Sequence, residues 1–300
     1  MNKWLKSFLT LTVTLLLVAC QSKSHQTPQK EESTAPSEPE SQVVTGTVYS
    51  KTLGMDWNYD IYLPKDYDAH ADETYPIFYL LHGIFGNHRN LLERYDSQTI
   101  LDRIMANEKQ DALVVFVDGF NSFYIDQKEG QQMETAIMED LIPAMEKLYA
   151  VDPNRSAHAI GGISMGGYGA ARLALKYNDY FSKALLLSPA IWSTANIPEN
   201  FKEDLHAFND GDTNWSDTVY ETLLPQQLLD PSKKNVEFYV ISSKDDQTIP
   251  IDDVKQFVND LKTNEIPVKF TEDHGEDHNW QYWEKAAKKG YKWLIQQFKS

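Results

Sequence analysis

The sequence has few cysteines and few basic side chains. Its one cysteine, Cys20, has no second thiol to pair with, so the fold must rest on its hydrophobic core rather than on an internal disulfide. With 300 residues, 41% of them hydrophobic, the chain is long enough for one large α/β domain. The chain has 28 Lys and Arg residues and 44 Asp and Glu residues, which gives a formal net charge of -16. Because binding to nucleic acid needs basic patches, this charge argues against a nucleic-acid partner.

The apolar run near the N-terminus, residues 8–19, is too short for a membrane-spanning helix, which needs about 20 residues. Lys3 and Lys6 precede the run, and Leu-Val-Ala-Cys closes it at Cys20. A positive segment followed by a short apolar one is typical of a signal peptide. The ending resembles the lipobox of bacterial lipoproteins, in which the cysteine receives a diacylglyceryl group. We therefore predict a signal peptide over residues 1–19 and a lipid anchor on Cys20, outside the cytoplasm.

Residues 21–42 contain Pro, Ser, Thr, Glu and Gln and no large apolar side chain before Val43. A segment of this composition cannot bury enough surface to offset the entropy lost on ordering. Residues 20–42 are therefore predicted to be a lipidated and disordered tether. The folded domain is predicted over residues 43–300.

From Val43 onward, strand-like and helix-like patterns alternate. Apolar or alternating runs predict strands, and longer amphipathic segments predict the helices between them. Uninterrupted apolar strands are typical of a mostly parallel sheet covered on both faces, so the pattern predicts an α/β fold. A helix with a kink at Pro143 is expected over residues 133–149, and residues 196–232 are expected to form a small lid-like insertion. The strands are expected near residues 43–50, 57–63, 75–81, 113–117, 158–160, 184–188, 236–242 and 267–270.

Residues 162–166, Gly-Ile-Ser-Met-Gly, fit the pattern G-x-S-x-G. In a nucleophile elbow this spacing places the serine on a strained turn between a strand and a helix, so that its hydroxyl projects from the backbone. The pentapeptide alone also fits a glycine-rich turn with a solvated serine. The predicted strand before it and helix after it favour the elbow, with Ser164 as the nucleophile.

A second loop, His82-Gly83, follows the apolar strand at residues 75–81. In proteins with a nucleophile elbow, one amide donor for a developing oxyanion comes from the residue after the nucleophile, and another from a loop after an early strand. These donors are predicted to be the N–H groups of Met165 and Ile84, with Phe85 as a neighbouring candidate. His82 is expected to bond the loop backbone rather than to act as a base.

The acid and the base of a serine triad are expected in that order after the nucleophile. Asp245 and Asp246 both follow the predicted strand at residues 236–242; Asp246 is favoured and Asp245 remains the alternative. The base is predicted to be His278, because Trp280 and Trp283 can pack its loop in place.

His274 is expected at the surface. Its i, i+4 spacing with His278 permits a metal site, but Gly275 and the lack of an H-E-x-x-H order argue against one. No metal or other cofactor is predicted.

Together these segments resemble an esterase family that includes esterase D (S-formylglutathione hydrolase), tributyrin esterases, feruloyl and acetylxylan esterases, and mycolyltransferases. The resemblance implies an α/β-hydrolase fold, with Ser164 as nucleophile, His278 as base and an aspartate between them in the chain. A serine stands where the family usually has a glycine before the acid, which keeps both aspartates open. The resemblance is carried by residues 81–83, 121–124, 162–170 and 278–283.

The sequence therefore predicts a serine carboxylesterase that acts through an acyl-enzyme on short-chain acyl, acetyl or feruloyl-type esters. Its partner would be a small-molecule or glycan-linked ester. Two alternatives share the same fold. One is an acyltransferase to a cell-envelope acceptor, as the mycolyltransferase relatives imply. The other is a non-catalytic surface binding lipoprotein.

Overall fold

The structure, a computed structural model, describes residues 41–68, 72–204, 206–209, 215–233 and 235–299. The predicted signal peptide, Cys20 and the tether up to residue 40 lie outside the described residues. No helix within the described ranges is both long and apolar enough to span a bilayer.

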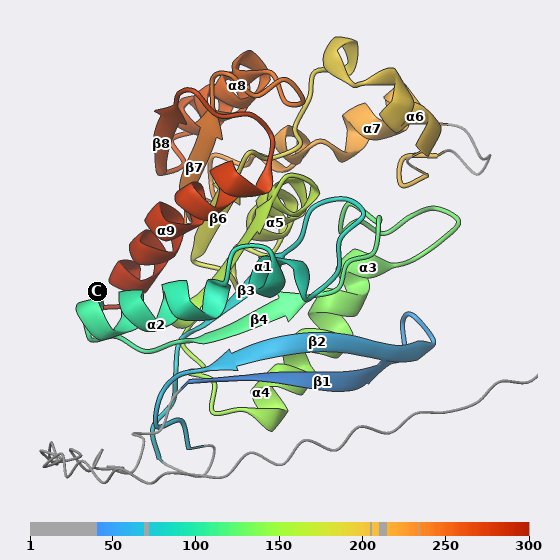
Figure 1. Cartoon of the computed structure of the whole chain (residues 1–300). Helices are drawn as coiled ribbons and strands as arrows, with labels where there is room; N and C mark the ends of the chain where they lie inside the picture. Colours follow the sequence, from blue (N-terminus) through green and yellow to red (C-terminus); the bar gives the residue numbers. More distant parts are fainter. Residues whose placement is uncertain (1–40, 69–71, 205, 210–214, 234, 300) are drawn as a thin grey trace, which may run out of the picture. The chain divides into compact units, whose positions relative to one another are not determined.

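The centre of the fold is an eight-stranded sheet with the order β1-β2-β4-β3-β5-β6-β7-β8 (Figure 1). β1 and β2 form an antiparallel hairpin that pairs antiparallel with β4, and all other neighbours are parallel. This confirms the predicted mostly parallel α/β-hydrolase sheet. The strands are β1 (Gln42–Ser50), β2 (Met55–Leu63), β3 (Ile77–Leu81), β4 (Leu113–Val117), β5 (His158–Ile163), β6 (Lys183–Leu187), β7 (Glu237–Ser243) and β8 (Val268–Asp273).

Helices cover both faces of the sheet (Figure 1). In β3 the side chains of Ile77, Tyr79 and Leu81 belong to one core cluster, and those of Phe78 and Leu80 belong to the other. The period of two along a strand divides the apolar residues in this way. The first cluster is covered by α3 (Met133–Thr135), α4 (Ile142–Leu148), α5 (Met165–Lys176) and α8 (Ile251–Thr263), and the second by α1 (Asn90–Glu93), α2 (Ser97–Glu108) and α9 (Trp280–Gln297).

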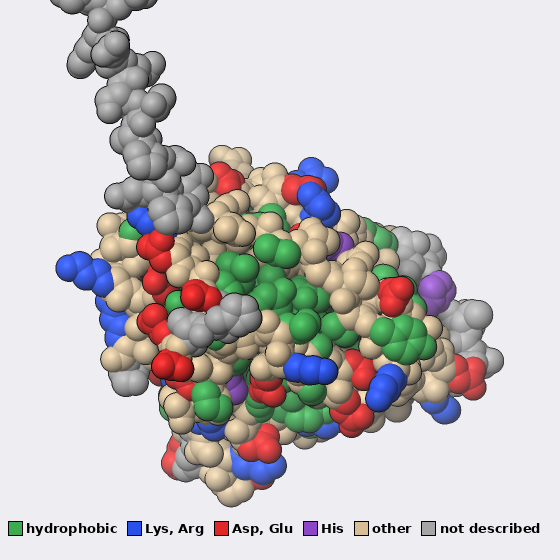
Figure 2. Space-filling model, turned by 90° about the horizontal axis from the view of Figure 1, so that it is seen from below, with side chains coloured by type: hydrophobic (Ala, Val, Ile, Leu, Met, Phe, Trp, Pro, Cys, Tyr) green, Lys and Arg blue, Asp and Glu red, His purple; other side chains and the backbone are tan. Residues whose placement is uncertain are grey.

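Most of the charged residues lie at the surface, although Asp60, Glu134, Arg172 and Asp246 are buried. On the face seen from below, hydrophobic side chains gather near the middle, and Asp and Glu side chains surround them together with Lys and Arg (Figure 2). The interspersed acidic groups fit the formal net charge of -16.

The segment predicted as one helix with a kink at Pro143 has a different hydrogen-bonding pattern. A π-helical stretch, Ala136–Leu141, separates α3 from α4. Pro143 lies in the first turn of α4, where its missing N–H leaves no intrahelical bond unmade. The wider turn before the proline thus accommodates it.

The segment predicted as a lid, residues 196–232, contains α6 (Glu199–Asp204), α7 (Asp217–Leu223) and the 3-10 helix Pro225–Leu228. The centroid of the Phe208 ring lies 4.9 Å from that of Phe123 and 5.0 Å from that of Tyr220. The carbonyl of Leu223 accepts hydrogen bonds from the Tyr168 hydroxyl and the Arg172 guanidinium on α5. The end of α7 is therefore fixed to α5.

The first turn of α5 lies unusually close to the strands beside it. A Cβ on Gly166 would lie 2.1 Å from the carbonyl oxygen of Leu81, and a Cβ on Gly162 would lie 2.4 Å from the carbonyl carbon of Gly166. These neighbours are backbone atoms and cannot move aside as a flexible side chain can. Glycine is therefore required at both positions.

We predict that Gly162→Ala lowers the free energy of unfolding by about 3 kcal/mol, because the new methyl group overlaps the backbone of α5. Gly83→Ala is the matched control, since its Cβ would meet its nearest neighbour, the Cβ of Ser164, at an ordinary 3.5 Å. Urea unfolding followed by circular dichroism measures both variants. Equal midpoints for Gly162→Ala and the wild type would contradict the prediction.

Candidate active site

Ser164 stands between the end of β5 and the start of α5, as the elbow pattern predicts. Its backbone has φ 52° and ψ -116°, a strained conformation for a residue other than glycine. Three backbone hydrogen bonds hold it there. Its N–H donates to the carbonyl of Leu187 at 2.9 Å, and its carbonyl accepts from the N–H groups of Tyr168 at 3.1 Å and Ala190 at 3.0 Å. Strain of this kind costs about 1–3 kcal/mol and persists where the surroundings fix it.

The structure brings Ser164, His278 and Asp246 together. Nε2 of His278 lies 2.9 Å from the Ser164 hydroxyl oxygen, and Nδ1 lies 2.7 Å from Oδ2 of Asp246. Oδ1 of Asp246 accepts from the N–H groups of Thr248 at 2.9 Å and Ile249 at 2.8 Å. Both carboxylate oxygens are thus occupied, and donation from Nδ1–H leaves Nε2 free to accept the serine proton.

The choice between the two aspartates follows from this geometry. Asp246 contacts His278, whereas Asp245 turns to the other side of the loop and accepts from the N–H of Gly275 at 2.6 Å. Asp245 therefore ties the loop that carries His278 to the loop that carries the acid. Sequence reasoning missed this role, because no pattern in the chain indicates which of two adjacent carboxylates points to the histidine.

Two further bonds join the same loops. The Ser243 hydroxyl donates to the carbonyl of Glu276, and the N–H of Gln247 donates to the Asp277 carboxylate at 2.9 Å. Ser243, the serine that precedes the acid, thus makes a hydrogen bond between the two loops. A glycine at this position, as in the family pattern, could not make it.

Trp283 packs edge-on against the His278 imidazole, with centroids 4.8 Å apart at 88°. Trp280 in turn packs edge-on against Trp283, as expected for the start of the last helix. His274 is exposed, also as expected. The two tryptophans at the start of α9, one packed against the His278 imidazole and the other against the first, thus help to hold its loop in place.

Of the two predicted amide donors, Met165 directly follows the serine, and Ile84 follows Gly83, whose backbone lies close to Ser164. Met165 is the first residue of α5, so its N–H has no acceptor within the helix. Gly83, next to Ile84, approaches so closely that a Cβ there would meet the Cβ of Ser164. No acceptor for the Ile84 N–H is found among the described residues. The Phe85 N–H, the neighbouring candidate, donates to Oδ1 of Asn121 at 2.8 Å, so it is already used.

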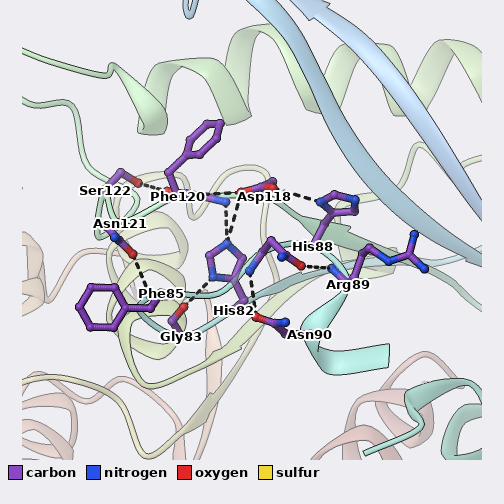
Figure 3. Close-up of polar contacts among 12 residues, drawn as sticks. His82, Gly83, Phe85, His88, Arg89, Asn90, Asp118, Phe120, Asn121 and Ser122 are labelled. Carbon is purple, nitrogen blue, oxygen red and sulfur yellow. Dashed lines mark hydrogen bonds and ion pairs between the residues drawn. The ribbon is translucent and has the colours of Figure 1, made fainter. Parts of the chain in front are cut away.

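His82 has the structural role that was expected. Its ring is fully buried, Nδ1 donates to the carbonyl of Gly83 at 2.7 Å, and Nε2 accepts from the N–H of Gly119 at 2.9 Å (Figure 3). The Tyr124 hydroxyl donates to the carbonyl of His82 at 3.1 Å. These bonds fix the peptide that precedes Ile84.

Asp118 extends this network. Its carboxylate accepts from Nδ1 of His88 at 3.0 Å and from the N–H of Phe120 at 3.2 Å (Figure 3). Burial alone would raise the pKa of Asp118, but the hydrogen bonds from the His88 imidazole and the Phe120 N–H outweigh burial and hold the pKa below its usual range. The group is therefore a carboxylate at neutral pH.

Among the described residues, no group of three or more His, Cys, Asp or Glu side chains is arranged to hold a metal ion.

A hydroxyl, an imidazole and a carboxylate joined in that order at the elbow of an α/β-hydrolase sheet define a serine hydrolase. Comparison with known proteins then identifies the family. The chain belongs to the family described as "Putative esterase", whose model matches residues 50–294. It is thus a member of a family of serine esterases, which are carboxylic ester hydrolases.

Individual relatives agree with this assignment. The chain is 30% identical over 242 residues to an acetyl esterase of Caldicellulosiruptor saccharolyticus, a match that covers 77% of this chain and 86% of the relative. A solved ferulic acid esterase is 25% identical with a TM-score of 0.75, covering 87% of this chain and 99% of that one. A fluorophosphonate-binding serine hydrolase of Staphylococcus aureus has the same fold, with a TM-score of 0.70 at 22% identity over 85% of this chain and 99% of that one.

We predict that Asp246→Asn reduces kcat for p-nitrophenyl acetate by about 10,000-fold, because the amide does not hold the histidine tautomer or stabilise the imidazolium. Asp245→Asn is the matched control, and its side-chain carbonyl still accepts from Gly275. We expect this control to lose less than about tenfold, as for one neutral hydrogen bond. A larger loss at Asp245 than at Asp246 would reverse the assignment.

Proposed function

We propose that the protein is a serine carboxylesterase with Ser164 as nucleophile, His278 as general base and acid, and Asp246 as the group that orients the imidazole. The observation that carries the proposal is the continuous hydrogen-bonded chain from Ser164 through His278 to Asp246, with distances of 2.9 Å and 2.7 Å. Ile84 and Met165 supply the amide donors.

The reaction proceeds in two halves. The Ser164 oxygen attacks the ester carbonyl while its proton passes to Nε2 of His278, and the N–H groups of Ile84 and Met165 bind the negatively charged oxygen. His278 then gives the proton to the leaving alcohol, which leaves an acyl group on Ser164. Water attacks the acyl-enzyme with His278 again as base, and the carboxylic acid is released.

The substrates we propose are esters with acetyl or other short acyl groups, on small alcohols or on glycans. The similarity to an acetyl esterase along most of both chains supports an acetyl group. The similarity to a ferulic acid esterase supports ferulic acid esters as a second class of substrate.

Replacing the nucleophile tests the proposal directly. Ser164→Ala is expected to abolish hydrolysis of p-nitrophenyl acetate, because no other side chain at the elbow can form the acyl-enzyme. A fluorophosphonate probe is expected to label the wild type and leave the variant unlabelled. An unchanged melting temperature would establish that the variant is folded, and activity retained in a folded variant would refute the proposal.

We further propose that the enzyme acts outside the cytoplasm, attached to a bacterial membrane by a lipid on Cys20. The support is in the sequence: a basic and then apolar leader that ends at the chain's one cysteine, followed by a polar tether. Stable anchoring needs two acyl chains, which a diacylglyceryl group provides. The tether then lets the esterase domain reach substrates away from the bilayer.

Metabolic labelling with radioactive palmitate in a bacterial host checks the anchor. We expect label in the wild type and none in Cys20→Ala, because the variant lacks the thiol that is modified. Ser164→Ala is the control and should be labelled like the wild type. Label in the Cys20→Ala protein would disprove the anchor without affecting the esterase assignment.

A further inference from the structure

The segment directly after β6 is hydrogen-bonded both to the nucleophile and to the loop of the acid. The N–H of Ala190 donates to the carbonyl of Ser164 at 3.0 Å. Two residues further on, the indole N–H of Trp192 donates to the carbonyl of Thr248 at 2.8 Å. Thr248 lies in the loop between Asp246 and α8. One short segment therefore links the backbone of Ser164 to the loop that carries the acid.

The peptide group that Trp192 binds also holds the acid. The carbonyl of Thr248 and the N–H of Ile249 belong to this one peptide, which is trans, so the two groups point in opposite directions. On the carbonyl side the peptide accepts from the indole, and on the other side the N–H of Ile249 donates to Oδ1 of Asp246 at 2.8 Å. The indole, the peptide and the carboxylate therefore form a continuous hydrogen-bonded chain.

This chain is shielded from water, because Trp192, Ile249 and Asp246 are all buried. In such surroundings a hydrogen bond is stronger than in water, and successive bonds polarise one another. The other oxygen of the same carboxylate, Oδ2, accepts from His278. A rotation of the peptide would therefore also turn the oxygen that meets the imidazole.

Trp192 is itself fixed by the segment at residues 196–232. The Tyr220 hydroxyl on α7 accepts from the backbone N–H of Trp192 at 2.9 Å and donates to its carbonyl at 3.1 Å. Burial raises the pKa of the Tyr220 hydroxyl well above its usual value, so the group keeps its proton and can donate. The indole also packs against the rings of Phe123 and Phe201, with centroids 6.4 Å and 5.8 Å away.

Two bonds of a different kind follow Trp192 along the chain. The N–H of Ser193 donates to Oδ2 of Asp253 on α8 at 2.9 Å, and the Asn196 amide donates to Oδ1 at 3.1 Å. Both bonds are exposed, and neither reaches the acid. They attach the segment to α8 independently of the indole, so the loss of the indole N–H should leave the segment in place.

We propose that Trp192, held by Tyr220, is a positioning residue of the catalytic acid. Its indole N–H orients the peptide that donates to Asp246, and the second carboxylate oxygen is thereby directed to His278. The segment at residues 196–232 thus influences the reaction through the acid. This inference rests on the proposed esterase function and adds to it a residue that acts through another residue.

Trp192→Phe tests the proposal because it keeps an aromatic ring and removes the indole N–H. We expect kcat for p-nitrophenyl acetate to fall about tenfold, as for the loss of one hydrogen bond, while KM changes by less than about twofold. The rate constant for labelling by a fluorophosphonate probe should fall by a similar factor, because labelling also needs the activated serine.

A double-mutant cycle with Asp246→Asn separates positioning from a general structural effect. Once the carboxylate has been replaced, its orientation no longer matters. In that background Trp192→Phe should therefore change kcat by less than about twofold. The residual rates are measured against Ser164→Ala, which gives the background of the assay.

Tyr220→Phe is a second, milder variant. It removes the hydroxyl that holds the Trp192 backbone, and we expect kcat to fall about threefold with KM unchanged. Tyr62→Phe is the matched control, because Tyr62 on β2 is also a buried tyrosine and its hydroxyl donates to Asp102 at 2.7 Å. Both tyrosine variants should lower the melting temperature, but the control should keep the kcat of the wild type.

An unchanged kcat in folded Trp192→Phe protein would overturn the proposal. A tenfold loss that persists in the Asp246→Asn background would also overturn it, because the effect would not pass through the acid. A rise in KM alone would instead make Trp192 a substrate contact. If Trp192→Phe does not fold, the same cycle with Tyr220→Phe decides. Failure of the wild type to hydrolyse the ester and to take up the probe would contradict the esterase function itself.

Discussion

The active site depends on the close approach between the first turn of α5 and the end of β3. Gly166 leaves so little space beside the Leu81 carbonyl that no side chain fits there. This contact fixes the start of α5, with the strained Ser164 and the amide of Met165, against the end of the strand that leads into the loop of Gly83 and Ile84. Backbone packing thus positions the nucleophile, and the same packing bears on the two amides that we propose as oxyanion donors.

The other half of the site is held differently. Asp246 and His278 lie on two loops at the ends of β7 and β8, and these loops are joined by Ser243, Asp245 and Asp277 as well as by the acid–histidine bond itself. The bonds that align the imidazole therefore come from side chains in the loops. The position of Ser164 thus depends on glycines that let two backbones approach closely. The position of His278 depends instead on hydrogen bonds made by side chains.

The sequence was sufficient for most of the fold and for the chemical residues whose patterns are local. The elbow around Ser164 and the apolar runs of the central strands follow from spacing and periodicity, and the position of His278 follows from its place after the last strand. The structural role of His82 could also be predicted, because a histidine inside a tight loop has backbone acceptors close by.

What the sequence could not supply depends on contacts between distant segments. Adjacent aspartates differ only in the direction of their side chains, and Asp245 is directed by Gly275, thirty residues away. The N–H of Phe85 is a possible oxyanion donor by sequence, but in the structure it donates to Asn121, thirty-six residues further along the chain. The π-helical stretch before Pro143 likewise depends on how the helix packs on the sheet, and no local sequence pattern predicts it.

The attachment of the 196–232 segment has a consequence for how this enzyme can change over evolutionary time. Its α7 is joined to the helix of the nucleophile through Leu223, and the Tyr220 hydroxyl exchanges hydrogen bonds with the backbone of Trp192. A rearrangement of α7 would therefore disturb the helix that presents Ser164. Substitutions that alter the attachment of α7 are therefore expected to affect catalysis as well as substrate preference, whereas replacements of exposed side chains that make no bond to α5 can change without this cost.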